Sequence, residues 1–391
     1  MAVYLDHAAS TAMRVEVAQL VSSMQTTIGN PNSVHAFGQA AKANLEQSRE
    51  TIATALNCDR NEVIFTSGGT EANNLAVLGL FEARNKDIKR PIVVCLPTEH
   101  HAVLEACEYL ERTADAQLEL IPVNSMGQPD LEWLAQFLDL NQDRVALVAT
   151  IWCNNETGVI VDLAGIAEIC KRLHIPLHTD AVAAVGHIDV DFAALGVSTL
   201  AFAGHKIGAG LGSGGLLVGR SVKVSPRAFG GSQERAIRPG TQDVVAAAGL
   251  AEAVRLATAE LEPSRAHWAQ LRERLIRGLQ AQLANFIVVG EETASERQLA
   301  NICNIVFPGC AGESLLFLLD TAGVAISNGS ACNAGVVGGS HVLKAMGLSD
   351  RDSASPVRVS LGVSTTEADI DAFLAAIGPA QERALAAGFT I

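Results

Sequence analysis

The sequence predicts an α/β fold, in which a large domain with a mostly parallel seven-stranded sheet stands beside a smaller α+β domain. Three observations lead to this prediction. Short apolar runs alternate with helix-length segments over the first part of the chain. A helical pattern then extends from Val244 to Leu283, and a second group of apolar runs follows it. Strands that alternate with helices require crossover connections, which produce a parallel sheet covered on both faces.

In the large domain, seven apolar runs have the length of a strand. They are Val63–Thr66, Pro91–Leu96, Leu118–Val123, Val145–Ile151, Ile175–His178, Thr199–Ala203 and Gly215–Val218. Continuous apolar runs are typical of parallel strands that are buried on both faces. The segments Leu131–Leu138 and Leu163–Leu173 lie between such runs and repeat apolar residues at helical spacing.

The helical stretch has Pro263 near its middle, where we expect it to break and to bridge two domains. Further strands are then predicted at Phe286–Val289, Ile302–Phe307, Val324–Ser327 and Val357–Leu361. We place the large domain at 15–260. The small domain comprises 1–14 and 261–391 and carries a loop at about 327–341.

Composition narrows the class of protein. The chain has 391 residues, a formal net charge of −14 and a mean hydropathy of +0.24. Its apolar residues are dispersed, and no run reaches the roughly 20 that a membrane-spanning helix needs. The negative charge argues against nucleic acid as a ligand. The eight cysteines and ten histidines show no metal-ligand spacing, and no secretion signal is present, so we expect no metal and a cytoplasmic location.

Polar residues follow the predicted strands at the edge where functional residues collect in such sheets. Gly69 and Thr70 open a helix, whose N–H groups suit a phosphate, although such turns are also common structural caps. Lys206 lies just past the end of a predicted strand, where desolvation lowers the pKa of an amine and favours Schiff-base formation. Asp180, at another strand end, suits a pyridinium nitrogen. A single such charge is usually a surface residue, but several polar strand ends at one edge favour a site.

These residues belong to a series of motifs that resembles the NifS/IscS-type cysteine desulfurases, which are fold-type I pyridoxal-phosphate enzymes of the class V aminotransferase group. The resemblance covers nearly the whole chain, and the order and spacing of its motifs are specific. The motifs are Tyr4–Thr11, Gly29–Ser33 with His35 and Gly38, Thr66–Asn74, Glu99-His100, Asn154–Gly158, Asp180, Gly204–Lys206, Gly230-Gly231, Gln233–Arg235, Arg238–Thr241, Gly329–Cys332 and Arg358–Gly362.

The resemblance implies pyridoxal 5'-phosphate as the cofactor. Lys206 would bind it covalently and later move protons, and Asp180 would pair with its pyridine nitrogen. His100 would stack on the ring and assist proton transfer. Five further residues would contact the phosphate or the ring hydroxyl, with the last of them reaching in from the second subunit of a homodimer. They are Gly69 with Thr70, His205, Asn155 and Thr241.

The resemblance also implies L-cysteine as the substrate, with Arg358 clamping its carboxylate and Asn155 beside it. Cys332 would be the nucleophile that takes the sulfur as a persulfide and leaves alanine. A sulfur-acceptor or iron–sulfur scaffold protein would receive that sulfur. Two cofactor positions depart from the family. Ala183 replaces a glutamine that bonds the ring hydroxyl, and Ala203 replaces a phosphate-binding hydroxyl residue. Losing a hydrogen bond to a charged group costs about 1.5–3 kcal/mol unless another donor replaces it.

Two alternatives remain open. Selenocysteine lyase shares the cofactor chemistry and similar motifs, and its substrate differs by one atom. A catalytically impaired homologue that serves as a binding partner in sulfur trafficking is the second alternative, motivated by Ala183.

The sequence also gives expectations for five other histidines. We expect His101 to point away from His100, because adjacent residues face different directions. Capping or packing roles are expected for His7, His35, His178 and His187.

Overall fold

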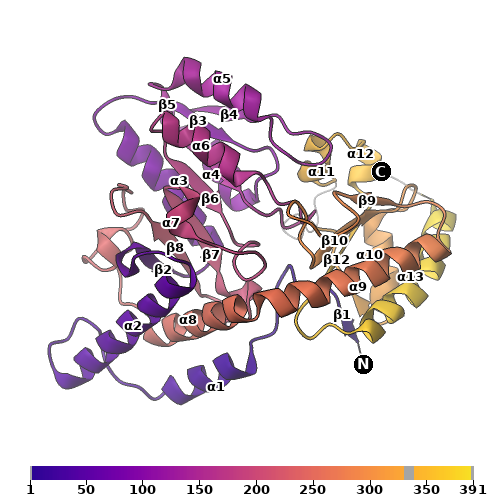
Figure 1. Cartoon of the computed structure of the whole chain (residues 1–391), viewed down its shortest axis with the longest axis horizontal. Helices are drawn as coiled ribbons and strands as arrows, with labels where there is room; N and C mark the ends of the chain where they lie inside the picture. Colours follow the sequence, from indigo (N-terminus) through magenta and orange to yellow (C-terminus); the bar gives the residue numbers. More distant parts are fainter. Residues whose placement is uncertain (1, 330–338, 389–391) are drawn as a thin grey trace.

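The computed structural model describes residues 2–329 and 339–388 (Figure 1). Its central feature is a seven-stranded sheet in the order β2-β8-β7-β6-β5-β3-β4. The strands are β2 (Val63–Thr66), β3 (Ile92–Cys95), β4 (Gln117–Leu120), β5 (Val145–Ile151), β6 (Leu177–Asp180), β7 (Thr199–Ala203) and β8 (Gly214–Val218). Only β8 runs antiparallel to its neighbours, β2 and β7. The predicted mostly parallel sheet is therefore confirmed.

Helices cover both faces of this sheet. They are α1 (Val15–Met24), α2 (Ala36–Ala55), α3 (Gly69–Asn85), α4 (His101–Ala114), α5 (Leu131–Asn141), α6 (Leu163–Arg172), α7 (Phe192–Leu195) and α8 (Val244–Ala259). One apolar core packs α3 and α4 against one face, and the other core packs α2, α5, α6 and α8 against the opposite face. Every residue of β5 is consequently buried, which explains its unbroken apolar run.

A second group of elements forms its own core. An antiparallel sheet contains β9 (Ile287–Val289), β10 (Ile302–Val306) and β12 (Pro356–Ser360), while β1 (Val3–Tyr4) pairs in parallel with β11 (Val324–Ala325). The helices here are α9 (Leu261–Gln282), α10 (Gly312–Thr321), α11 (His341–Ala345), α12 (Asp350–Ser353) and α13 (Glu367–Ala387). Buried residues of α9, α10, α13, β10 and β12 share one apolar cluster, which also includes Leu5. The predicted domain boundaries stay a prediction.

The predicted helix break falls earlier than Pro263. Helix α8 ends at Ala259 and α9 begins at Leu261, so the two run end to end beneath both sheets in Figure 1. Pro263 instead lies in the first turn of α9. Backbone N–H groups in a first turn have no intrahelical acceptor, so proline costs the helix no hydrogen bond there. Strand β6 also extends two residues past the predicted His178, because Thr179 and Asp180 continue to pair with β5 and β7.

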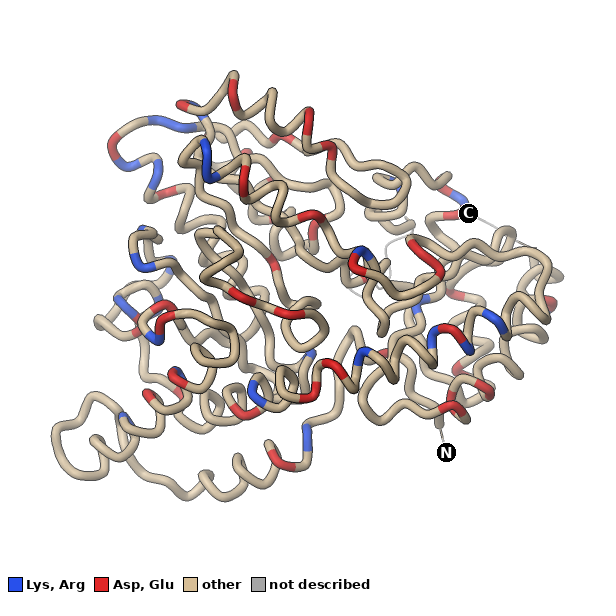
Figure 2. Tube along the Cα trace, in the orientation of Figure 1, with Lys and Arg blue, Asp and Glu red and all other residues tan. Residues whose placement is uncertain are grey.

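Charged residues lie mainly on the helices and loops around the sheets (Figure 2). Within the seven strands of the large sheet, all of them in the described part of the chain, only Glu119 and Asp180 are charged. Glu119 is partly exposed on the edge strand β4, whereas Asp180 is buried in the interior strand β6. Among residues 2–329 and 339–388, no helix has the combined length and apolar character that crossing a bilayer requires.

Candidate active site

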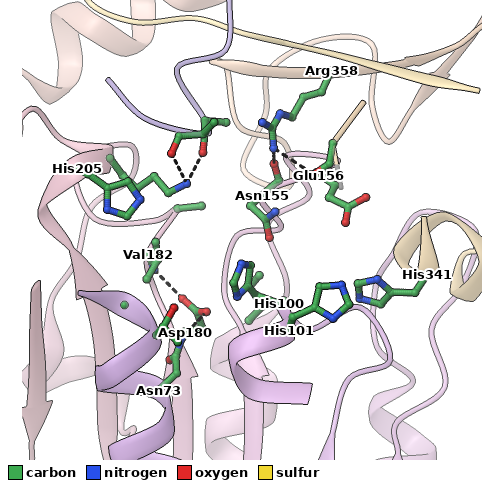
Figure 3. Close-up of a pocket in the computed structure, with 18 residues that line it drawn as sticks. Asn73, His100, His101, Asn155, Glu156, Asp180, Val182, His205, His341 and Arg358 are labelled. Atoms are coloured by element: carbon green, nitrogen blue, oxygen red, sulfur yellow. Dashed lines mark hydrogen bonds between the residues drawn. The ribbon is translucent and has the colours of Figure 1, made fainter. Parts of the chain in front are cut away.

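A cavity of about 290 Å³ lies at the edge of the large sheet where β6 and β7 end (Figure 3). It brings together nine of the residues predicted for the site. They are Gly69, Thr70, His100, Asn155, Asp180, Ala183, His205, Lys206 and Arg358. Ala203 is buried at the end of β7 and does not line the cavity. Thr241 is exposed elsewhere, and Cys332 lies outside the described residues.

Asp180 is the last residue of β6 and is 2% exposed. Its Oδ1 accepts a hydrogen bond from the Val182 backbone N–H at 2.9 Å, and its Oδ2 accepts one from Asn73 Nδ2 at 2.7 Å. Burial raises the pKa of Asp180, while the nearby His100 and Lys206 act in the opposite direction. A cation placed against this carboxylate would therefore be stabilised by a preformed, desolvated partner.

Lys206 ends a short 3₁₀ turn, Gly204–Lys206, that directly follows β7. Its Nζ donates to the carbonyl oxygen of Ala9 at 3.1 Å and also to that of Ala8. Those two carbonyls belong to an N-terminal turn that Tyr4 closes, because its hydroxyl donates to the backbone oxygens of Asp6 and Ser10. A segment paired with the small sheet thus holds the lysine of the large one.

His100 is the N-cap of α4, and its Nδ1 accepts from the Ala102 backbone N–H at 3.1 Å. A neutral His100 must therefore carry its proton on Nε2. Burial lowers the pKa of His100 and, with the adjacent Lys206, lowers the pKa of His205 to about 4. Both imidazoles are therefore neutral at physiological pH.

Gly69 and Thr70 form the first turn of α3, a helix of 17 residues. First-turn N–H groups of a helix have no intrahelical acceptor and point toward an anion bound there. A side chain at Gly69 would force Val182 to shift, because its Cβ would lie 2.6 Å from Val182 Cγ2. Glycine therefore allows the start of α3 to approach the turn that follows Asp180.

Arg358 reaches the cavity from β12 and is 2% exposed. Its Nη2 donates to Asp6 Oδ1 at 2.7 Å, and its Nη1 donates to the Asn155 carbonyl at 2.9 Å. Among the described residues, its buried Nε has no hydrogen-bond partner. The guanidinium therefore retains a donor that a bound carboxylate could use.

The sequence from 3 to 373 matches the model of the aminotransferase class-V family. The chain belongs to that family. An IscS-like cysteine desulfurase of Mycobacterium tuberculosis (strain ATCC 25618 / H37Rv) is 41% identical over 389 residues, covering 98% of this chain and 98% of the relative. The X-ray structure of a NifS-like protein from Rickettsia africae ESF-5 is 31% identical, with a TM-score of 0.87, over 98% of this chain and 100% of that one. A structure of SspA in complex with cysteine is 29% identical, with a TM-score of 0.79, over 92% of this chain and 98% of that one.

Class-V aminotransferases depend on pyridoxal phosphate, and the residues of this cavity fit that group. The buried carboxylate of Asp180 matches a cationic ring nitrogen, and the amine of Lys206 matches a carbonyl carbon. The first turn of α3, which begins at Gly69, presents backbone N–H groups that suit a phosphate. Ala183 also lines the cavity, and its methyl side chain has no hydrogen-bond donor.

Several lining residues of this class-V site were not predicted as site residues, among them Asn73, His101, Glu156 and His341. The expectation that His101 points away is wrong, because the cap and first residue of α4 both turn their rings toward the cavity. Its ring packs against His341, with centroids 4.8 Å apart. The sequence holds no local signal for His341, which arrives from α11 and donates through Nε2 to the Glu99 carbonyl at 2.9 Å.

Glu156 had a weak signal, since it stands in the Asn154–Gly158 motif. Asn154 Oδ1 accepts from the N–H groups of Glu156 and Thr157, and the resulting turn aims Asn155 and Glu156 at the cavity. Glu156 Oε2 accepts from Ser340 Oγ at 2.6 Å, which ties the start of α11 to the large sheet. Among the other histidines, His35 caps α2 as expected, through the Gly38 N–H.

Proposed function

We propose that this protein is a pyridoxal-phosphate-dependent cysteine desulfurase, which converts L-cysteine to L-alanine and holds the released sulfur as a persulfide on Cys332. The observation that carries the proposal is the meeting of Asp180, Lys206 and Arg358 in one cavity of about 290 Å³. The first two come from the large sheet and suit the cofactor. Arg358 comes from the small sheet and suits an amino-acid carboxylate.

When bound, pyridoxal phosphate supplies an electron sink for charge that develops on the carbon atoms of the amino acid. Asp180 would hold a proton at the ring nitrogen, and His100 would lie against the ring. The N–H groups of Gly69 and Thr70, with His205, would hold the phosphate. Lys206 would attach the cofactor and then carry protons on Nζ between carbon atoms of the substrate.

The sulfur step is balanced without an external oxidant. Arg358 holds the substrate carboxylate, and the thiolate of Cys332 attacks the sulfur atom of the substrate. A sulfur–sulfur bond forms as the carbon–sulfur bond breaks, and its electron pair remains with the substrate β-carbon. Protonation of that carbon, with Lys206 or His100 as the donor, gives alanine. The persulfide on Cys332 then passes its outer sulfur atom to an acceptor protein, for which we propose a sulfur carrier or an iron–sulfur scaffold.

We also propose that the active form is a homodimer in which Thr241 enters the site of the other subunit. Support comes from large apolar side chains left exposed in the chain, including Phe229 (91% exposed), Val34 (89%) and Phe37 (66%). Sedimentation analysis should show a dimer at micromolar concentration. A monomer that binds cofactor tightly would contradict this part.

We propose the cytoplasm as the compartment. The seven cysteines among the described residues are all free, which fits this proposal.

The decisive experiment is to add pyridoxal phosphate to the purified protein and follow its absorbance, then to measure alanine and sulfide released from L-cysteine with a thiol reductant. We expect a yellow protein whose absorbance band is abolished by Lys206→Ala. Cys332→Ala should keep the band and lose sulfur transfer. A protein that stays colourless contradicts the proposal and favours the impaired binding partner. Turnover of selenocysteine without alanine formation from cysteine would instead assign a selenocysteine lyase.

A further inference from the structure

A chain of buried hydrogen bonds runs from Asp180 through Asn73, which also lines the cavity, into the large sheet. Asn73 Nδ2 lies 2.7 Å from Asp180 Oδ2, and Asn73 Oδ1 lies 2.9 Å from His178 Nε2. His178 Nδ1 in turn lies 2.9 Å from Thr199 Oγ1. The four side chains come from α3, β6 and β7, and none is more than 2% exposed. They form one polar path through an otherwise apolar part of the sheet.

The chemistry of each group fixes the direction of every bond. An ionised Asp180 only accepts, so Asn73 must turn its amide nitrogen toward it and its oxygen toward His178. That oxygen also only accepts, so His178 must carry a proton on Nε2. Burial lowers the pKa of His178 to about 3, so the ring is neutral and its Nδ1 is an acceptor for the Thr199 hydroxyl. The Thr199 hydroxyl therefore donates to His178, His178 donates to Asn73, and Asn73 donates to Asp180.

We propose, on the basis of the function proposed above, that Asn73 and His178 are positioning residues that keep Asp180 ionised and aimed at the ring nitrogen of the cofactor. Among the described residues, two hydrogen-bond donors reach the Asp180 carboxylate, the Val182 N–H and Asn73 Nδ2. Without His178, the Asn73 amide could rotate and present its oxygen to the carboxylate. Two facing acceptors repel each other, so Asp180 would hold its own proton instead of leaving it on the ring.

A second buried carboxyl group in the same region has fewer hydrogen-bond donors than Asp180. Glu99 is 0% exposed, and its Oε1 accepts from the Ile151 N–H at 2.6 Å. Its Oε2 has no partner among the described residues. Burial raises the pKa of Glu99 well above its ordinary value, with Asp180 adding to the shift. Asp180 differs in having an amide donor whose own orientation is fixed from behind.

A simple packing role for His178 predicts a different pattern of substitutions. A buried histidine that only fills space can be replaced by leucine with little effect on a distant ligand, because leucine has a similar volume. Glutamine at the same position can still donate from an amide nitrogen placed near the original Nε2. The two substitutions therefore separate a packing role from a hydrogen-bonding role. The other titratable groups that face Asp180 are His100, Lys206, Glu99 and Cys153, and they stay unchanged in both variants.

The test compares wild type, His178→Leu, His178→Gln and Asn73→Ala. Cofactor affinity is measured by absorbance titration, and protonation of the ring nitrogen is followed by NMR with cofactor labelled with ¹⁵N at that atom, from pH 6 to 9. We expect His178→Leu and Asn73→Ala to weaken cofactor binding roughly 10- to 100-fold and to lose the ring proton at lower pH, as removal of a charged-group hydrogen bond implies. His178→Gln should remain close to wild type in both measurements.

The control is His187→Leu, which replaces a half-buried histidine outside the path and should bind cofactor as wild type does. Melting of each cofactor-free protein checks folding, and Asn73→Ala carries the test if His178→Leu does not fold. Wild-type affinity and an unchanged ring-proton signal in Asn73→Ala and His178→Leu would overturn the positioning role while leaving the proposed function intact. Equal losses in His178→Gln and His178→Leu would also overturn it. A wild-type protein that binds no cofactor would overturn both proposals.

Discussion

Asp180 and Arg358 line the same cavity and are equally buried, but the protein supports their charges in opposite ways. Asp180, on the large sheet, is held by two neutral donors, Asn73 Nδ2 and the Val182 N–H. Arg358, on the small sheet, is already paired with the carboxylate of Asp6. Under the proposed function, this difference would let Asp180 hold the cationic ring of the cofactor, whereas Arg358 would exchange Asp6 for the carboxylate of the substrate.

The largest effect is expected from Asp180→Asn, which keeps the shape of the side chain and removes its charge. Cofactor affinity should fall roughly 100- to 1,000-fold, because one partner of a buried ion pair is lost. The cofactor-free protein should respond in the opposite sense. Because burial raises the pKa of Asp180 above 3.8, folding binds a proton and stability falls as pH rises through the shifted pKa.

Asp180→Asn removes that penalty, so the cofactor-free variant should melt at a higher temperature than wild type at pH 8. The two proteins should converge as the pH is lowered toward 4. The control is Glu119→Gln, the other charged residue in the seven strands, which should change neither melting nor affinity. A variant that is less stable than wild type at pH 8 would show that Asp180 is not a destabilising charge in the empty site.

The second effect concerns Arg358→Lys, which keeps the charge but loses the two-pronged geometry that matches a carboxylate. We expect kcat/KM for L-cysteine to fall roughly 10- to 100-fold, while the absorbance of the bound cofactor stays as in wild type. Steady-state kinetics and absorbance measure the two quantities. The exposed Arg274→Lys, on α9, serves as the control. Loss of cofactor in Arg358→Lys would contradict the assignment of Arg358 to the substrate alone.

A smaller gain is expected from Ala183→Gln, which returns a donor to a position that lines the cavity. Cofactor affinity should rise, by up to about 10-fold, as one added hydrogen bond allows. Ala203→Ser is the matched comparison, because Ala203 is buried outside the cavity lining and its hydroxyl should add nothing. If both variants bind cofactor like wild type, another group already satisfies the ring hydroxyl.

The smallest effect is expected from Asp6→Asn, which removes the anion that competes for Arg358. The KM for L-cysteine should fall about two- to fivefold, since Asp6 is 21% exposed and solvent screens part of its attraction for the buried guanidinium. Kinetics at constant pH measure the change. A rise in KM would mean that Asp6 orients the guanidinium for the substrate instead of competing with it.

The residues that were predictable from sequence are those whose position follows from the strand that precedes them. Lys206 and Asp180 each lie just past the end of a predicted apolar run, so their meeting at one edge follows from the parallel sheet. Asn73 and His341 could not be found in this way. Their approach to the cavity depends on how α3 packs against the sheet and on where α11 lies beside α4. His178 has the sequence appearance of a packing residue, and only its partners reveal the path to Asp180.

The central claim is that Lys206 carries the cofactor and Cys332 carries the sulfur. It is tested most directly by mixing the cofactor-loaded protein with L-cysteine in the absence of reductant, then locating added sulfur by peptide mass spectrometry and counting the alanine formed. The account predicts one added sulfur atom on the peptide that contains Cys332 and one alanine per active site, with neither in Lys206→Ala. Added sulfur on a different cysteine, or alanine formed at full yield by Cys332→Ala without reductant, would contradict it.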